Sequence, residues 1–164
     1  AVNIHDILSQ AKRVASAGFA EHLEIVEKYD PSLPLAKGDA DLLLQVVQNL
    51  LKNATEAVPS EFGQIIIETA YKPGVKLNIG NFTKENLPLQ FSIIDNGSGV
   101  PDQIRDDIFD PFVTTKSNGS GLGLSLVSKI VFDHGGVVEY ARVKNRSVFS
   151  VLMPVWTGLQ LKER

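Results

Sequence analysis

The chain has 164 residues, of which 43% are hydrophobic and 21% are charged. These proportions are typical of a globular domain and exclude collagen-like, disordered and membrane-embedded chains. Lys and Arg number 16 against 19 Asp and Glu, which gives a net charge of -3. Because no cluster of basic residues is present, we expect no nucleic-acid partner. The absence of cysteine excludes disulfides, thiolate nucleophiles and zinc–thiolate sites.

No apolar run approaches the roughly 18 residues that a membrane-spanning helix requires, and AVNIHDILSQ at the start does not resemble a secretory signal. We therefore expect a cytoplasmic protein with no membrane contact through this domain. Because the three histidines are scattered, any bound metal is expected to be a hard cation held by oxygen ligands. The length predicts one domain over 1–156 and a polar tail at 157–164.

Helical and strand periodicities alternate along the chain. Helices are predicted over 4–15, 40–58, 101–108 and 125–136, and strands over 23–29, 64–71, 89–95, 137–143 and 147–155. Asp39 is the expected N-cap of the second helix, and Pro59 is expected to end it. Polar loops are predicted around Gly80 and over 109–121. This order predicts an α+β fold, a two-layer α/β sandwich with helices covering one face of a mixed sheet.

A polar stripe runs along the border of the apolar face of the predicted 40–58 helix. Asn49, Asn53 and Glu56 recur at helical spacing and therefore lie one above another. One interpretation is that these side chains form hydrogen bonds with a neighbouring loop. The other is an oxygen-rich wall for a magnesium ion and its phosphates, because amide carbonyls suit a hard cation.

The first glycine cluster, DNGSGV at 95–100, follows directly on a predicted strand. Asp95 in such a turn commonly caps its own backbone. The functional interpretation is a partly buried carboxylate that accepts a hydrogen bond from an exocyclic amine such as that of adenine. Gly97 and Gly99 would then allow a ring to approach the backbone.

The second glycine cluster, GSGLGL at 119–124, leads directly into a predicted helix. Glycines before a helix leave N–H groups free to point at an anion, so Gly119, Gly121 and Gly123 are suited to hold phosphate. The run is neither a dinucleotide fingerprint nor a P-loop, since no strand precedes it and no Gly-Lys-Ser/Thr follows.

Between the clusters, FDPFVTTKSN at 109–118 has the composition of a lid anchored by two aromatic residues. Lys116 is placed to meet a terminal phosphate as a point charge. The alternative is that Phe109 and Phe112 are core residues and Lys116 a solvated surface lysine.

Taken together, these motifs resemble the ATP-binding catalytic domain of bacterial sensor histidine kinases, in the superfamily shared with gyrase, the Hsp90 chaperones and MutL-type repair proteins. QNLLKNATEA resembles the N box of that family, DNGSGV its G1 box, FDPF its F box and GSGLGL its G2 box. The amino-acid sequence over nearly all of residues 2–155 is similar to that of the nitrogen-regulatory type of sensor kinase.

The resemblance implies a site for ATP and Mg²⁺. It implies that Asn53 ligates magnesium with Asn49 nearby, and that Asp95 reads the adenine amine in a pocket shaped by Gly97 and Gly99. The residues that would hold the phosphates are Thr115, Lys116, Gly119, Gly121, Leu122 and Gly123.

The resemblance also bears on the chemistry. Many family members carry a phosphate-contacting lysine where Glu56 stands, so we expect that contact to come from Lys116. In ATP-hydrolysing relatives a glutamate general base occupies the position of Asn49, and an amide cannot accept a proton. Asn49 and Lys116 are therefore expected to serve phosphoryl transfer, with water a poor acceptor.

The implied acceptor is a histidine on a separate dimerisation domain of the same kinase. His5 is not expected to be that acceptor because the Pro-Leu element of the acceptor box is missing after it, and His22 and His134 are expected to be structural. Further implied partners are a response-regulator receiver domain and a PII signal protein; the whole kinase would be a homodimer and this domain a monomer. The alternative function is a non-catalytic nucleotide-responsive module acting through its lid.

Overall fold

The computed structural model describes residues 1–59, 61–73, 77–79, 82–84, 87–110 and 123–158. Its helices are α1 (Ile4–Ala17), α2 (Ala40–Ala57), the short 3-10 helix η1 (Arg105–Asp107) and α3 (Gly123–Asp133). Its strands are β1 (Glu24–Lys28), β2 (Gln64–Tyr71), β3 (Leu77–Ile79), β4 (Phe82–Lys84), β5 (Leu89–Asp95), β6 (Val137–Val143) and β7 (Arg146–Met153). The predicted alternation of helices and strands is confirmed.

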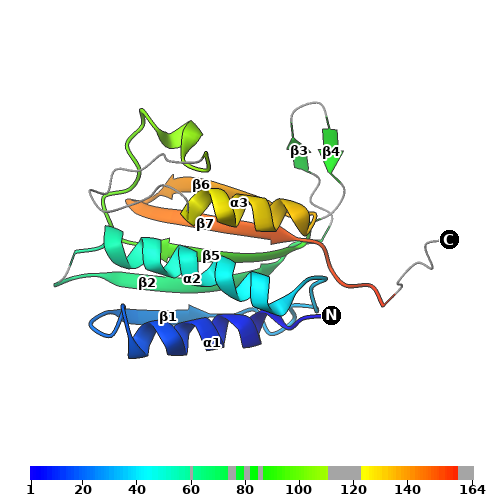
Figure 1. Cartoon of the computed structure of the whole chain (residues 1–164), viewed down its shortest axis with the longest axis horizontal. Coiled ribbons are helices and arrows are strands. Elements are labelled where there is room, and N and C mark those ends of the chain that lie inside the picture. Colours follow the sequence, from blue (N-terminus) through cyan, green and yellow to red (C-terminus); the bar gives the residue numbers. More distant parts are fainter. Residues whose placement is uncertain (60, 74–76, 80–81, 85–86, 111–122, 159–164) are drawn as a thin grey trace.

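Five strands form one sheet in the order β1-β2-β5-β7-β6. β1 runs parallel to β2, and the other neighbours are antiparallel, so the sheet is mixed. The three α-helices lie on one face of it, with α1 beside β1, α2 over the middle strands and α3 over β7 and β6 (Figure 1). The predicted two-layer α+β sandwich is thus confirmed. No helix in the described ranges is long and apolar enough to cross a membrane.

The structure differs from the predicted elements in three regions. The loop around Gly80 contains the small hairpin β3-β4, whose three-residue strands are too short to show a period in the sequence. Only η1 forms within the predicted 101–108 helix, where no side chain caps the first turn. α3 spans Gly123–Asp133, two residues earlier than expected at its start and three at its end, where Gly135 has a φ of +75°.

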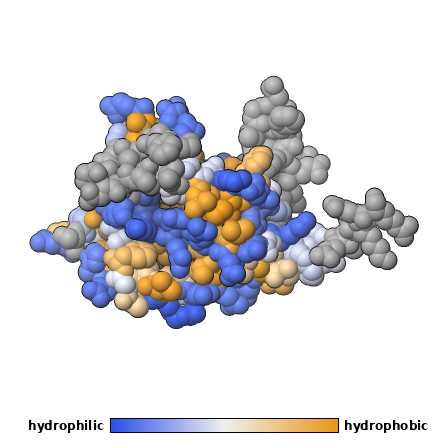
Figure 2. All heavy atoms as spheres, viewed as in Figure 1, coloured by the Kyte–Doolittle hydropathy of each residue, from blue (hydrophilic) through white to orange (hydrophobic). Residues whose placement is uncertain are grey.

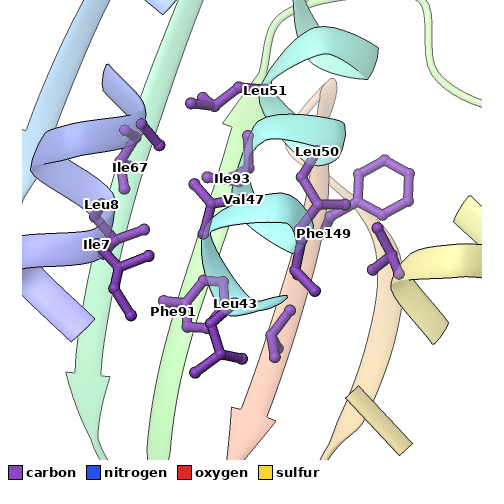
Figure 3. Close-up of a cluster of buried hydrophobic side chains, with 14 of the residues drawn as sticks. Ile7, Leu8, Leu43, Val47, Leu50, Leu51, Ile67, Phe91, Ile93 and Phe149 are labelled. Atoms are coloured by element: carbon purple, nitrogen blue, oxygen red, sulfur yellow. The ribbon is translucent and has the colours of Figure 1, made fainter. Parts of the chain in front are cut away.

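The core lies between α2 and the sheet. Leu43, Val47 and Leu50 on one face of α2 belong to a cluster of buried side chains that includes Phe91 and Phe149 of the sheet (Figure 3). Leu43 and Leu50 are fully buried, and burying a leucine contributes about 1.5–3 kcal/mol. The position of α2 over the sheet is therefore strongly determined, and its polar flank is held in place with it.

Two side chains hold the start of α2, of which the sequence predicted Asp39 as the N-cap. Asp39 accepts a hydrogen bond from the Leu42 N–H through Oδ1 at 3.1 Å, which confirms it as the N-cap. His134, at the end of α3, accepts from the Asp39 N–H through Nε2 at 3.0 Å, and its Nδ1 bonds the Ile130 carbonyl at 2.7 Å. His134 is structural, as predicted, and joins the end of α3 to the start of α2.

Candidate nucleotide-binding site

Asp95 is the last residue of β5 and lies deep in the protein. Its side chain and backbone are 2% exposed. Oδ1 accepts a hydrogen bond from the Gly97 N–H at 2.8 Å, so the expected turn cap is present. A carboxylate accepts through two oxygens, and capping by Oδ1 is compatible with recognition of a ligand amine by Oδ2.

The environment of Asp95 acts on its pKa in two directions. Burial raises the pKa of the carboxyl above its ordinary value, while the Gly97 N–H and the positive charge of Arg142 lower it. Burial is the largest of the three effects. The Gly97 N–H and Arg142 therefore support the ionised form, which is the stronger acceptor for a hydrogen bond from an amine.

Neighbouring protein atoms leave little space for a side chain at Gly97 and Gly99, the two glycines after Asp95. A Cβ at Gly97 would lie 2.8 Å from the carbonyl carbon of Ala57 and 2.9 Å from Asp95 Oδ1. Gly99 has a φ of +84°, and a Cβ there would lie 3.0 Å from Arg142 Nη1. The expectation that these glycines leave room for a ring stays a prediction, and the structure adds close approach to α2 and β6 as a reason for them.

The start of α3 lies beside Asn49 on α2. A Cβ at Gly123 would stand 3.6 Å from Asn49 Oδ1, while Asn49 Nδ2 donates to the Gln45 carbonyl at 3.0 Å. The positive end of the α3 dipole thus lies next to the first asparagine of the stripe. The other predicted phosphate contacts lie outside the described residues: Thr115, Lys116, Gly119, Gly121 and Leu122.

The two asparagines of the stripe on α2 lie at the edge of the core, as predicted, whereas Glu56 does not. Asn49 and Asn53 are partly buried and Glu56 is exposed. Among the described residues, Asn49 donates a hydrogen bond within its own helix, to the Gln45 carbonyl. Both interpretations of the stripe, as a contact to a neighbouring loop and as a wall for magnesium, stay predictions.

The donor set fits magnesium. Mg²⁺ prefers oxygen ligands and usually takes only one or two from the protein, with phosphates and waters completing its shell. The described ranges hold no group of three or more His, Asp or Glu side chains that could bind a metal alone. A single amide oxygen from Asn53 together with nucleotide phosphates is consistent with that preference.

Sequence reasoning missed a cluster of side chains on β6 and β7. Arg142 Nη1 donates to the Gly97 carbonyl at 2.8 Å and to Ser147 Oγ at 3.0 Å. The Val100 N–H donates to the Tyr140 hydroxyl at 3.0 Å. The one available signal was that Tyr140 and Arg142 occupy the inward positions of an alternating strand.

Asn49 also borders an open depression between α1 and α2. It has a volume of about 350 Å³ and includes the partly exposed apolar residues Val14 and Phe19 beside Lys52. Figure 2 shows that hydrophobic areas on this side of the molecule are separated by hydrophilic residues.

Residues 38–157 match the model of the histidine kinase-, DNA gyrase B- and HSP90-like ATPases. The chain belongs to this family. It is 49% identical over 162 residues to the sensory histidine kinase/phosphatase NtrB of Azospirillum brasilense. That match covers 98% of this chain and 40% of the relative, so the chain spans less than half the length of that relative.

The chain is also similar to solved structures of histidine kinases. The catalytic domain of histidine kinase ThkA superposes with a TM-score of 0.75 at 25% identity, covering 93% of this chain and 95% of that one. ThkA in complex with the response regulator TrrA gives a TM-score of 0.73 at 25% identity, covering 94% and 41%. Full-length ShkA in complex with AMPPNP gives 0.71 at 26% identity, covering 94% and 31%.

Proposed function

We propose that this chain binds Mg²⁺-ATP and donates the γ-phosphoryl group to a histidine on a separate dimerisation domain, as the catalytic part of a two-component sensor kinase in nitrogen regulation. The observation that carries the proposal is the contact between the start of α3 and Asn49. It brings the positive end of a helix dipole together with an amide that cannot act as a general base.

The geometry of α2 accommodates an extended ligand. At its C-terminal end, Ala57 packs against the Gly97 turn that follows Asp95; two turns earlier, Asn49 lies beside Gly123. Eight residues of helix separate these contacts, or about 12 Å along the axis. A nucleotide with its adenine at Asp95 and its phosphates at the start of α3 would lie along this flank of α2, past Asn53.

Each group has a separate part in the proposed reaction. Asp95 would orient the adenine and Asn53 would hold Mg²⁺, which when bound neutralises phosphate charge. The N–H groups at Gly123 would stabilise the transferring group, together with Thr115, Lys116, Gly119, Gly121 and Leu122. Phosphoryl transfer depends mainly on such positioning and charge stabilisation. Because Asn49 accepts no proton, bound water is not activated and the nucleophile comes from the acceptor domain.

The complex of ThkA with TrrA supports a response regulator as one proposed partner, and the other proposed partners are implied by the resemblance to NtrB-type kinases. The proposed partners are the histidine-containing dimerisation domain of the same kinase, the receiver domain of a response regulator, and a PII signal protein near the lid. We further propose that the domain works in the cytoplasm, as a monomeric part of a homodimeric kinase.

The test is transfer of label from γ-labelled Mg²⁺-ATP, through this chain, to a separately supplied dimerisation domain of an NtrB-type kinase. We expect acid-labile label on the acceptor histidine, no label on the same domain with that histidine changed to alanine, and little hydrolysis without acceptor. Asn53→Ala should abolish transfer. Efficient hydrolysis without acceptor would contradict the proposal, and nucleotide binding without transfer would favour the nucleotide-responsive module.

A further inference from the structure

The β6-β7 hairpin holds the turn that follows Asp95. Arg142 and Tyr140, two residues apart on β6, both point to the covered face of the sheet and reach this turn. Arg142 bonds the Gly97 carbonyl, and Tyr140 accepts from the Val100 N–H. Both ends of the four-residue segment 97–100 are therefore fixed by side chains of a single strand.

Strand register places these groups together. Ser147 on β7 is the Cα partner of both Arg142 on β6 and Asp95 on β5. Its buried hydroxyl lies 3.0 Å from Arg142 Nη1 and 3.2 Å from the Tyr140 hydroxyl, so it joins the two contacts. The arginine is held from one side by Ser147 and holds Gly97 on the other.

We propose that Arg142 is a positioning residue for nucleotide selectivity: by fixing the Gly97 carbonyl, it keeps the Gly97 N–H aimed at Asp95 Oδ1 and so orients the carboxylate toward the exocyclic amine of an adenine nucleotide. The inference rests on the proposed ATP binding and adds the residue that sets discrimination among purines. The two hydrogen bonds of Arg142 come from one nitrogen, so a lysine ammonium can replace them in part.

The charge of Arg142 acts in the same direction as its hydrogen bond. It lowers the pKa of the buried Asp95 carboxyl and so favours the form that accepts from an amine. Arg105, the other arginine near this cluster, stacks over the Tyr140 ring at 5.5 Å and donates to the Val100 carbonyl at 3.1 Å. Arg105 thus supports the far end of the same turn.

The experiment compares the dissociation constants of ATP and ITP, because inosine carries a carbonyl where adenine carries its exocyclic amine. Variants of the full chain are Arg142→Met, Arg142→Lys and Tyr140→Phe. Arg146→Met is the matched control: Arg146 lies on the same hairpin, but its Nη1 bonds Gln64 Oε1 on β2 at 3.1 Å rather than the backbone of the 97–100 segment. Thermal unfolding of each variant is measured in parallel.

We expect Arg142→Met to weaken ATP binding about tenfold, the effect of losing one hydrogen bond of a charged group. ITP binding should change little, so the ITP/ATP ratio, the dissociation constant of ITP divided by that of ATP, should fall. Arg142→Lys should recover most of that ratio, and Arg146→Met should leave it unchanged. If Arg142→Met does not fold, a fall of the ratio in Tyr140→Phe, which loses the other anchor of the turn, is the expected result.

An unchanged ratio in folded Arg142→Met, or an equal loss for both nucleotides, would overturn the inference. An unchanged ratio in Tyr140→Phe would do so where Arg142→Met does not fold. These outcomes differ from failure of the proposed function, in which the unaltered chain binds neither nucleotide.

Discussion

The backbone at Gly97 packs directly against the carbonyl group of Ala57, with space for no side chain between them. This contact joins the turn after β5 to the last turn of α2. Because the same turn carries the hydrogen bond to Asp95, any shift of α2 relative to the sheet changes the place where adenine is expected to bind.

Substitution of Gly97 by alanine should destabilise the fold through a steric clash with α2. The added Cβ meets the carbonyl of Ala57, a backbone group that cannot move aside without shifting the helix. We expect Gly97→Ala to lower the free energy of unfolding by about 1–3 kcal/mol, as overpacking does. Gly123→Ala is the control, because among the residues that the structure describes its Cβ meets Asn49 Oδ1 at an ordinary 3.6 Å. Equal stability of the two variants in urea denaturation would contradict this prediction.

Asp95→Asn should lose ATP affinity and gain stability at neutral pH. Burial raises the folded-state pKa of Asp95 above its unfolded value, so stability from this group falls as pH rises between the two values. The neutral asparagine removes that cost, and its oxygen can still accept from the Gly97 N–H. We expect at least tenfold weaker ATP binding at pH 7.5. Urea denaturation at pH 7.5 should show a higher midpoint, and a lower one would contradict the assignment.

Acidification should weaken ATP binding. Because the pKa of Asp95 is raised, the loss should begin at a higher pH than it would with an aspartate of ordinary pKa. The ionised carboxylate accepts more strongly from the adenine amine than the protonated carboxyl does, and burial raises the pKa of this group. Removing the charge of Arg142 takes away one of the effects that lower this pKa, so Arg142→Met should lose affinity at a still higher pH. Dissociation constants measured from pH 8 to 5 check this against Arg146→Met, since protonation of ATP affects both alike. Coincident profiles would contradict the role of the Arg142 charge.

His5 should make the fold sensitive to mild acid. Its ring stacks on Tyr29 at 4.6 Å, its Nε2 lies 2.8 Å from Thr69 Oγ1, and burial lowers its pKa. Because the unfolded chain then binds a proton more readily than the folded one, stability is full above the unfolded pKa, about 6.5. It is lost as pH falls from there toward the lowered folded value.

The check for His5 is the pH dependence of the free energy of unfolding between pH 7.5 and 5. We expect His5→Gln to reduce the slope of that dependence. The exposed His22 offers the control, and His22→Gln should leave the slope as it is. Similar slopes for His5→Gln and the unaltered chain would exclude His5 as the cause.

Local pattern accounts for most of the predicted architecture. α2 was predicted over 40–58 and extends over Ala40–Ala57, because the cap, the apolar period and the terminating proline are all local signals in the sequence. The β3-β4 hairpin was missed because three-residue strands carry no period. Of the site, the motifs indicated Asp95, Gly97, Asn49 and Gly123, and the structure brings the first two and the last two together along α2.

By itself, the sequence determined the two-layer fold class and the presence of an amide, not a base, at Asn49, and it predicted the residues of the expected nucleotide site, since each depends on residue type at a local spacing. Only the tertiary structure decided that Arg142, Tyr140 and Ser147 serve the Asp95 turn. Their contact depends on how β6, β7 and β5 align, and a one-residue change of register would turn each of these side chains to the opposite face of the sheet.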